Sequence, residues 1–463
     1  MLPRLFALAS LLLAAACANA ARDDAARIAR IVDPIVEAEM RSVGIPGAAF
    51  VFVRDGRVVY RRGYGVSDVA SATPADPERT VWPIASITKT VTALAVLQQV
   101  DRGRLALDAD VNSSLRRLSV PDAGLGRLTL RHLLSHSGGL DELPGRQHDG
   151  APPPDLVAFL GPRLVRYRAP GRLTAYSTYG IALAGLLLED VSGEAYADYV
   201  RRNIFAPLGM ARSRIMVRRG DEAGVATPYR IEDGRAEPAP HEYYVTLSTS
   251  SMAASASDMA RLLLMHLGDG AIDGRRLLSA RLAREMRRQQ ATNPPALPGW
   301  SLGFQLDRVD GLDLAEHGGD IGGFSSLFTL IPELGAGFFI VHHGEGGDLR
   351  YKVREALLTA LRPPRPRAVP APDPARRQEL LAYAGRYLVS TACRSCPGDA
   401  DVFTLTVTED GALSLWGRRW LPLGGDLFVR QDGRRLLGFA RDEAGRIVSV
   451  TGGSWRVADR LED

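Results

Sequence analysis

The stretch Trp82-Pro83-Ile84-Ala85-Ser86-Ile87-Thr88-Lys89-Thr90 leads into an apolar run, Val91 to Val100, and then to Gly103. Because glycine suits the left-handed turn after a helix, this pattern predicts a buried helix that begins near Ser86 and stops at Gly103. Side chains three residues apart on a helix share a face. The hydroxyl of Ser86 and the amine of Lys89 can therefore share a hydrogen bond.

The composition makes Lys89 unusual. Only two of the 57 basic residues are lysines, Lys89 and Lys352, so the other 55 are arginines. Arginine stays protonated in proteins, whereas a desolvated lysine can become neutral and act as a base. A lysine within an apolar helix, one turn from a serine, therefore indicates a need for deprotonation. The alternative is an ordinary exposed lysine with an accidental Ser-x-x-Lys spacing.

The bulk properties are those of a globular protein of more than one domain. The chain has 463 residues, of which 46% are hydrophobic and 24% are charged. The net charge of +4 is small, and the arginines are scattered among acidic residues. We therefore expect no nucleic-acid partner.

The first twenty residues have the pattern of a secretory signal. Arg4 precedes an apolar run, Leu5 to Ala16, and Ala18-Asn19-Ala20 offers a cleavage site. Cleavage after Ala20 would leave a periplasmic or secreted protein. The second interpretation is a lipoprotein signal that leaves Cys17 lipidated. We expect no integral membrane segment in the rest of the chain.

Two cysteines, Cys393 and Cys396, lie in the last part of the chain. In an oxidising compartment this pair can close a small disulfide. A thioredoxin-like role is disfavoured because no strand-helix-strand pattern surrounds the pair. Without nearby histidines the two thiols make a poor metal site, and we expect no metal and no cofactor.

The hydrophobic patterns predict an α+β architecture. Residues 24–43 have helical spacing, and two strand patterns flank Asp55-Gly56, which is a hairpin signal. A mostly helical middle follows, and strand patterns return from Leu302 until a helix at Tyr351 to Leu361.

The C-terminal part differs in composition. Residues 362–377 are rich in proline and predict a semi-rigid linker. Short alternating segments separated by glycine turns then predict a small antiparallel barrel or sandwich over 378–463. The predicted strands are 402–408, 412–416, 427–430, 436–440 and 447–451. The expected organisation is a signal peptide at 1–20, a catalytic domain at 21–361, the linker, and this β-domain. A carbohydrate-binding role for the β-domain is one alternative, and a lid or packing module is the other.

Three separated stretches together resemble one family. Ser86-Ile87-Thr88-Lys89, Tyr176-Ser177-Thr178 and His317-Gly318-Gly319 occur in the order of the serine β-lactamase-like hydrolases. That superfamily includes class C β-lactamases, penicillin-binding proteins, D-amino-acid peptidases and esterases. The resemblance covers roughly residues 25–361 and implies a β-lactamase/transpeptidase-like domain, with an antiparallel sheet, covering helices and an all-helical part.

The resemblance also implies catalytic roles. Ser86 would be the acylated nucleophile, and Lys89 the adjacent base that a serine hydroxyl needs. Tyr176 matches the family's tyrosine, whose hydroxyl relays protons to the leaving group. The alternative for Tyr176 is a core aromatic with a satisfied hydroxyl.

The third motif would form the substrate-binding edge. His317 stands where β-lactamases carry lysine, which disfavours a β-lactam specialist; it could donate to a substrate carboxylate or to Tyr176, with a charge that varies near neutral pH. Gly319 would let the strand approach the substrate closely. The resemblance implies an oxyanion hole made by the amides of Ser86 and Asp320. The Asp320 carboxylate would then have to point away from the developing charge.

One residue departs from the family pattern. Thr178 stands where the family usually has asparagine, whose amide holds both the substrate amide and the motif lysine. This difference favours ester hydrolysis over β-lactam or peptide hydrolysis. The segment His136-Ser137-Gly138-Gly139 is interpreted as a structural turn.

Three functions remain open. The first is a secreted serine hydrolase acting through an acyl-enzyme on small esters, amides or D-amino-acid peptides. The second is a β-lactamase or DD-carboxypeptidase proper, which Thr178 and His317 disfavour. The third is a non-catalytic receptor for cell-wall fragments, which the complete set of Ser86, Lys89 and Tyr176 disfavours.

Overall fold

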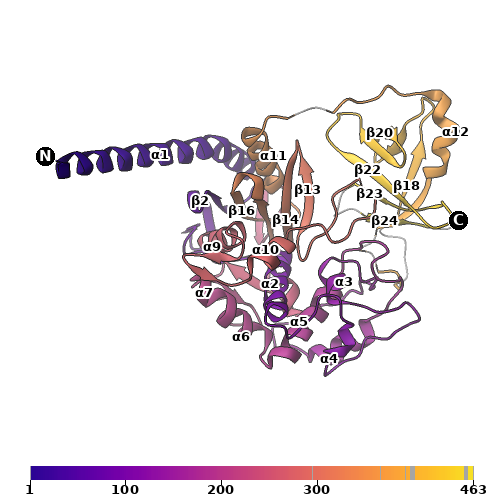
Figure 1. Cartoon of the computed structure of the whole chain (residues 1–463), viewed down its shortest axis with the longest axis horizontal. Coiled ribbons are helices and arrows are strands. Elements are labelled where there is room, and N and C mark those ends of the chain that lie inside the picture. Colours follow the sequence, from indigo (N-terminus) through magenta and orange to yellow (C-terminus); the bar gives the residue numbers. More distant parts are fainter. Residues whose placement is uncertain are drawn as a thin grey trace.

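The computed structural model describes residues 2–294, 296–364, 367–389, 391, 393–396, 402–452 and 457–461, with side chains described from residue 23 onward. Figure 1 shows a body of sheet and helices joined to a smaller β-barrel. The predicted fold class is confirmed, and of the two alternatives for the C-terminal domain the structure has the barrel.

A seven-stranded antiparallel sheet forms the centre of the larger body. Its strands, in spatial order, are β13 (Gln305–Val309), β14 (Leu312–Ile321), β15 (Phe324–Ile331), β16 (Ala336–His343), β1 (Gly47–Arg54), β2 (Arg57–Asp68) and β3 (Thr73–Pro74). The hairpin predicted at Asp55-Gly56 is confirmed, because β1 and β2 pair with Arg54 opposite Arg57.

Both faces of the sheet are buried, so β1 has no polar face. One face, with Phe50 and Phe52, packs against α1 (Leu2–Val43) and α11 (Leu349–Leu361). The other face, with Val51 and Val53, packs against α9 (Ala256–Leu267) and the helical part. A strand covered on both sides is continuously apolar.

The helical part contains the predicted Ser86 helix. This helix, α2 (Thr88–Asp101), starts two residues later than expected, because Ala85–Ile87 form a 3₁₀ turn, η1. Gly103 follows in the left-handed conformation, as predicted. The other helices of this part are α3 (Leu130–Leu134), α4 (Leu156–Leu160), α5 (Thr178–Ser192), α6 (Tyr196–Val200), α7 (Ala206–Leu208), α8 (Leu247–Ser250) and α10 (Ala280–Glu285). A further helix, α12 (Arg377–Leu380), packs on the barrel (Figure 1).

Short strands complete the larger body. Three of them, β4 (Trp82–Pro83), β10 (Met252–Ala254) and β6 (Arg214–Ile215), form a small sheet directly before η1. The rest are hairpins or isolated pairs: β5 (Gln147–His148), β7 (Tyr229–Glu232), β8 (Arg235–Pro238), β9 (Tyr243–Tyr244), β11 (Ala271–Ile272) and β12 (Arg275–Arg276).

The closed barrel has a core of its own. Its strands are β17 (Gly385–Val389), β18 (Val402–Val407), β19 (Leu413–Leu415), β20 (Arg418–Gly424), β21 (Leu427–Arg430), β22 (Leu436–Arg441), β23 (Ile447–Thr451) and β24 (Val457–Arg460). Closure pairs β17 with β24 and leaves no free edge. Of the eight strands, β17, β20 and β24 were not predicted.

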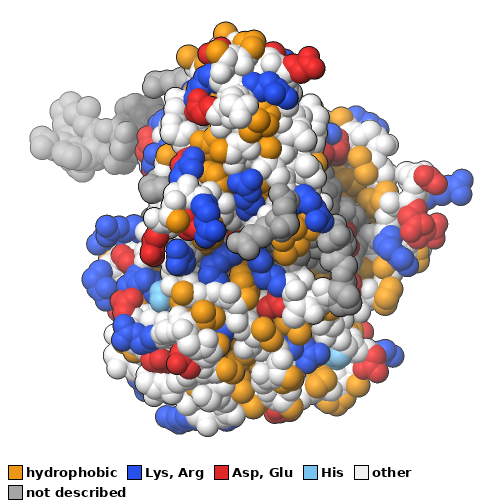
Figure 2. Space-filling model, turned by 90° about the vertical axis from the view of Figure 1, so that its right-hand side faces the viewer, with side chains coloured by type: hydrophobic (Ala, Val, Ile, Leu, Met, Phe, Trp, Pro, Cys, Tyr) orange, Lys and Arg blue, Asp and Glu red, His pale blue; other side chains and the backbone are white. Residues whose placement is uncertain are grey.

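The barrel touches the larger body through charged groups. Arg168 lies 2.6 Å from the carboxylate of Asp459, and Arg394 pairs with the same carboxylate. Figure 2 shows Lys and Arg side chains gathered along this junction. Cys393 and Cys396 form a disulfide in the loop that carries Arg394, as the spacing allowed.

At the N-terminus, α1 runs through both the predicted signal segment and the predicted 24–43 helix. In Figure 1 its first turns extend away from the body. The Cys17 side chain lies outside the described residues, so the signal and the lipid anchor stay predictions. Within the part of the chain that the structure describes, no helix combines the length and apolarity needed to span a membrane.

Candidate active site

Ser86 lies on a strained turn. The preceding Ala85 adopts φ 50°, a left-handed conformation that costs a non-glycine residue about 1–3 kcal/mol. The turn brings Ser86 to a partly exposed position while Ala85 and Ile87 stay buried. The Ser86 hydroxyl is therefore accessible to a substrate, although the residues on either side of it are buried.

Lys89 lies beneath Ser86 in the core. Its Nζ is 2.9 Å from Oγ of Ser86 and donates to the carbonyl of Thr249 in α8 at 3.0 Å. The side chain is 1% exposed. Burial lowers the pKa of Lys89 well below its usual value, and Arg146 lowers it further while Glu142 opposes the shift. The ammonium is therefore destabilised, and Lys89 can accept the proton of Ser86.

Tyr176 completes this group. Nζ of Lys89 lies 5.1 Å from the centre of the Tyr176 ring, and the Ser86 hydroxyl is near enough to the tyrosine hydroxyl to lower its pKa. Burial raises the pKa of Tyr176, and the effect of Ser86 only partly offsets that rise. The phenol is therefore neutral at ordinary pH and can pass a proton on.

Two aromatic side chains that were not predicted as site residues hold the Tyr176 ring. The ring of His136 lies 4.5 Å from that of Tyr176, and Trp300 lies 5.6 Å away. His136 Nδ1 also accepts a hydrogen bond from the amide of Ser177 at 3.0 Å, and α5 begins directly after Ser177. The segment 136–139 thus acts as the structural turn that was expected, but its histidine also contacts the motif tyrosine.

His317 faces the same group from β14, with its ring 6.2 Å from that of Tyr176. Burial lowers the pKa of His317 to about 3, and Lys89, whenever it is protonated, lowers it further. The expectation that its charge varies near neutral pH is therefore wrong. Nδ1 lies 2.7 Å from the Gly318 carbonyl, which can only accept, so the neutral ring presents Nε2 as an acceptor rather than the expected donor.

Gly319 lies where β14 passes η1. A Cβ at this position would be 2.2 Å from the carbonyl oxygen of Ile84, so only glycine allows this approach. The next residue, Asp320, directs its carboxylate away from the site, toward Arg350 at 2.6 Å and the Ser325 hydroxyl at 2.8 Å. With the carboxylate held there, only the backbone of Asp320 is left to act at the edge of β14.

A buried carboxylate that the sequence analysis missed lies next to the tyrosine motif. Glu142 accepts hydrogen bonds from the amides of Thr178 and Tyr179, the latter at 3.2 Å. Its other oxygen pairs with Arg146 at 3.1 Å. Glu142 belongs to no motif, and the two amides that it binds lie 36 and 37 residues later in the chain. No local signal could therefore have indicated it.

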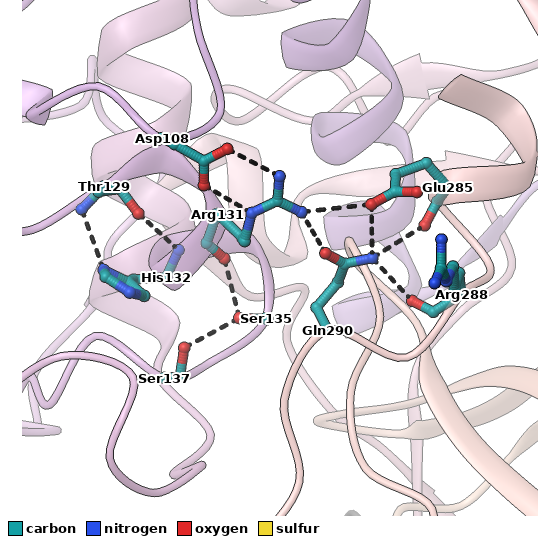
Figure 3. Close-up of polar contacts among 9 residues, drawn as sticks. All are labelled: Asp108, Thr129, Arg131, His132, Ser135, Ser137, Glu285, Arg288 and Gln290. Atoms are coloured by element: carbon teal, nitrogen blue, oxygen red, sulfur yellow. Dashed lines mark hydrogen bonds and ion pairs between the residues drawn. The ribbon is translucent and has the colours of Figure 1, made fainter. Parts of the chain in front are cut away.

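A polar network supports the turn that holds Tyr176 (Figure 3). At its centre, the guanidinium of Arg131 in α3 bonds Asp108 at 2.7 Å and Glu285 at 3.3 Å and also contacts Gln290. The carbonyl of Arg131 accepts from the Ser135 hydroxyl, which precedes His136. The network thus ties α3 and the His136 turn to the segment that leads to Trp300.

Replacing Arg131 with glutamine should destabilise the fold by about 1–3 kcal/mol, because several charge-assisted hydrogen bonds are lost together. Urea unfolding measures the change. The control is Arg308→Gln, whose pair with Asp313 is solvent-exposed and should cost no more than about 0.5 kcal/mol. Equal effects of the two substitutions would contradict the role given to Arg131.

A cleft lies near the end of β14. It has a volume of about 490 Å³ and is lined by Gln147, His148, Asp149, Arg219, Glu222, Pro240, His241, Glu242 and Tyr243. Glu242 also accepts a hydrogen bond from the amide of Gly322 at 3.2 Å, two residues after Asp320. In the described residues, no group of three or more His, Cys, Asp and Glu side chains is arranged to hold a metal ion.

Comparisons with known proteins agree with this geometry. A family model described as Beta-lactamase matches residues 32–361. Penicillin-binding protein 4 of Amycolatopsis lactamdurans is 32% identical over 315 residues, which are 63% of this chain and 79% of that protein. Esterase EstB of Burkholderia gladioli is 28% identical over 384 residues, 72% of this chain and 96% of that protein.

Solved structures extend the likeness to both bodies. The crystal structure of SurE superposes with a TM-score of 0.67 at 25% identity, covering 94% of this chain and 99% of that chain. The octameric penicillin-binding protein homologue from Pyrococcus abyssi gives 0.64 at 23% identity, covering 92% and 99%, and shows the fold alone. The chain therefore belongs to the Beta-lactamase family and is a serine hydrolase of that fold.

Proposed function

We propose that the chain hydrolyses small esters or amides, including D-amino-acid peptides, through an acyl-enzyme on Ser86. The observation that carries the proposal is the 2.9 Å approach of a fully buried lysine Nζ to the hydroxyl of a partly exposed serine. A desolvated amine in hydrogen-bond contact with a serine hydroxyl is suited to take up the proton of that hydroxyl.

In the proposed reaction, Lys89 removes the proton of Ser86 as Oγ attacks the substrate carbonyl. The amides of Ser86 and Asp320 would stabilise the resulting oxyanion. The neutral hydroxyl of Tyr176 passes a proton to the leaving group, the carbonyl re-forms, and the acyl-enzyme remains. Tyr176, left without its proton, then takes one from water as the water attacks the acyl-enzyme. Lys89 returns its proton to Oγ of Ser86 as the acid leaves, which restores all three groups.

Ester substrates are favoured over β-lactams. Thr178 has no amide to hold a substrate amide, and His317 is neutral, so it supplies no positive charge for the carboxylate of a penicillin. One relative is named an esterase and another a penicillin-binding protein, so the family itself does not decide between the two chemistries. A periplasmic or secreted location, inferred from the first twenty residues, belongs to the same proposal.

The test is active-site labelling. Mature protein is incubated with a fluorescent fluorophosphonate and, separately, with a fluorescent penicillin, and the same is done with Ser86→Ala. We expect the phosphonate to label the wild type and not the variant, and the penicillin to label neither. Penicillin labelling that depends on Ser86 would favour the β-lactamase or DD-carboxypeptidase alternative. Identical behaviour of both proteins with both probes would favour the receptor for cell-wall fragments.

A further inference from the structure

We propose that Glu142 is a positioning residue of this site, which fixes the Tyr176–Thr178 segment and holds a negative charge near Lys89 that replaces the asparagine amide missing at position 178. This inference rests on the proposed function, since it assigns a residue to that reaction. It goes beyond the motifs, because Glu142 belongs to none of them.

The first step is that Glu142 is buried in a fixed position. Its side chain is 7% exposed, and one oxygen accepts from two successive amides, those of Thr178 and Tyr179. The neighbouring Asp141 accepts from the amide of Glu142 at 2.9 Å and is itself 1% exposed. A buried carboxylate is normally neutralised or fully bonded, and here Arg146 supplies the opposite charge.

The second step is what Glu142 holds. Thr178 is the third residue of the tyrosine motif and the first residue of α5. Ser177 caps the same helix by accepting from the amide of Gly180 at 3.0 Å. Together, Ser177 and Glu142 fix the backbone immediately after Tyr176, so the direction of its hydroxyl depends on both.

The third step is electrostatic. An asparagine amide at position 178 would offer its oxygen to the motif lysine, and a threonine hydroxyl is too short to do so. Burial raises the pKa of Glu142, while Arg146 and the Tyr179 amide oppose that rise and favour the carboxylate. As a carboxylate, Glu142 raises the pKa of Lys89 against the larger effect of burial. The titratable and charged groups that surround Lys89 are Tyr176, His136, His317, Glu142 and Arg146.

Asp141 provides a matched control. Asp141 accepts hydrogen bonds from the amides of Arg394 and Ser395, at 2.8 and 3.0 Å, in the disulfide-closed loop of the barrel. It is a buried carboxylate one residue from Glu142, but it faces the barrel loop instead of the tyrosine motif. Asp141→Asn therefore removes a comparable charge without removing the contacts to Thr178 and Tyr179.

The composition allows a direct measurement. Because Lys89 and Lys352 are the only two lysines in the chain, ¹³C-lysine labelling gives two side-chain signals, and Lys352→Arg assigns them. The titration of Lys89 can then be followed by NMR without any substrate. This readout works even if Ser86 is never acylated, so failure of the inference and failure of the proposed function are distinguishable.

We expect Glu142→Gln to move the Lys89 titration to lower pH by about one unit, since the charge that favoured the ammonium is gone. The acid limb of kcat/KM should move in the same direction. Asp141→Asn and Glu142→Asp should leave the titration in place, and Glu142→Asp should lower kcat because the shorter side chain holds Thr178 less well. Adding Thr178→Asn to Glu142→Gln should restore part of kcat.

A folded Glu142→Gln variant whose Lys89 titrates as in the wild type would overturn the inference, whatever its activity. The inference would also be wrong if Asp141→Asn moved the titration as far as Glu142→Gln. Should Glu142→Gln alone not fold, the double variant with Thr178→Asn carries the same test, because it too lacks the charge.

Discussion

Replacing Lys89 with arginine should lower kcat by roughly 10²–10⁴ while leaving the fold intact. Arginine is a long cationic side chain like lysine, but it stays protonated in proteins. It therefore has no free site for the proton of Ser86. The 2.9 Å contact between Nζ and Oγ shows that no other group needs to move for the transfer in the wild type. The measurement is steady-state hydrolysis of an activated aryl ester, with circular dichroism as the check on folding.

The chain itself offers the control for this experiment. Lys352 is the second of the two lysines; its side chain is 52% exposed and pairs with Glu39 at 2.6 Å. Lys352→Arg should leave kcat within a factor of two. If Lys89→Arg kept more than half of the wild-type rate in a folded protein, Lys89 would not be the base.

The part of the site that is local in sequence could be predicted. Ser86 and Lys89 are one helical turn apart, so their spacing fixes their contact in any helix. Tyr176 and His317 came from motif order, and the structure brings both to within ring contact of each other. What the motifs could not give is the protonation of His317, because its pKa depends on burial by residues from four other segments.

The residues that the sequence analysis missed act through long-range contacts. Glu142 meets Thr178 across 36 residues, and Trp300 reaches Tyr176 from a segment of no regular pattern. Such contacts depend on how distant segments pack together, which no local pattern encodes. The shift of the helix start to Thr88 also involves a distant segment, since the left-handed Ala85 lies where β14 approaches closely at Gly319.

The barrel strands likewise fall into those that the local sequence predicts and those that it does not. Five of its strands alternate and end at glycine turns, and these were predicted. In contrast, β20 contains Pro422 and ends at Gly424, which argue against a strand when the sequence is considered alone. In the barrel, β20 pairs on both sides, with β19 and with β21, and this pairing holds it as a strand despite the local signal.

Removing the guanidinium of Arg354 should destabilise the larger body by about 3–5 kcal/mol. Arg354 in α11 and Glu316 in β14 are 8% and 6% exposed, and their atoms approach to 2.6 Å. A second carboxylate, Asp307 in β13, shares the same guanidinium at 2.6 Å. Arg354→Leu would leave Glu316 charged in the core without a cation. The loss of stability is large because nothing then compensates this buried charge.

The position of this pair connects stability with the site, because Glu316 precedes His317 on the strand that also carries Gly319 and Asp320. Urea unfolding measures the loss, and Glu355→Gln on the same helix is the control, since its pair with Arg434 is 65% exposed on both sides. The double variant Glu316→Leu with Arg354→Leu should recover at least half of the loss, because a buried pair replaced as a whole leaves no isolated charge. If the double variant were no more stable than Arg354→Leu alone, the destabilisation would come from lost packing instead of from the unpaired carboxylate.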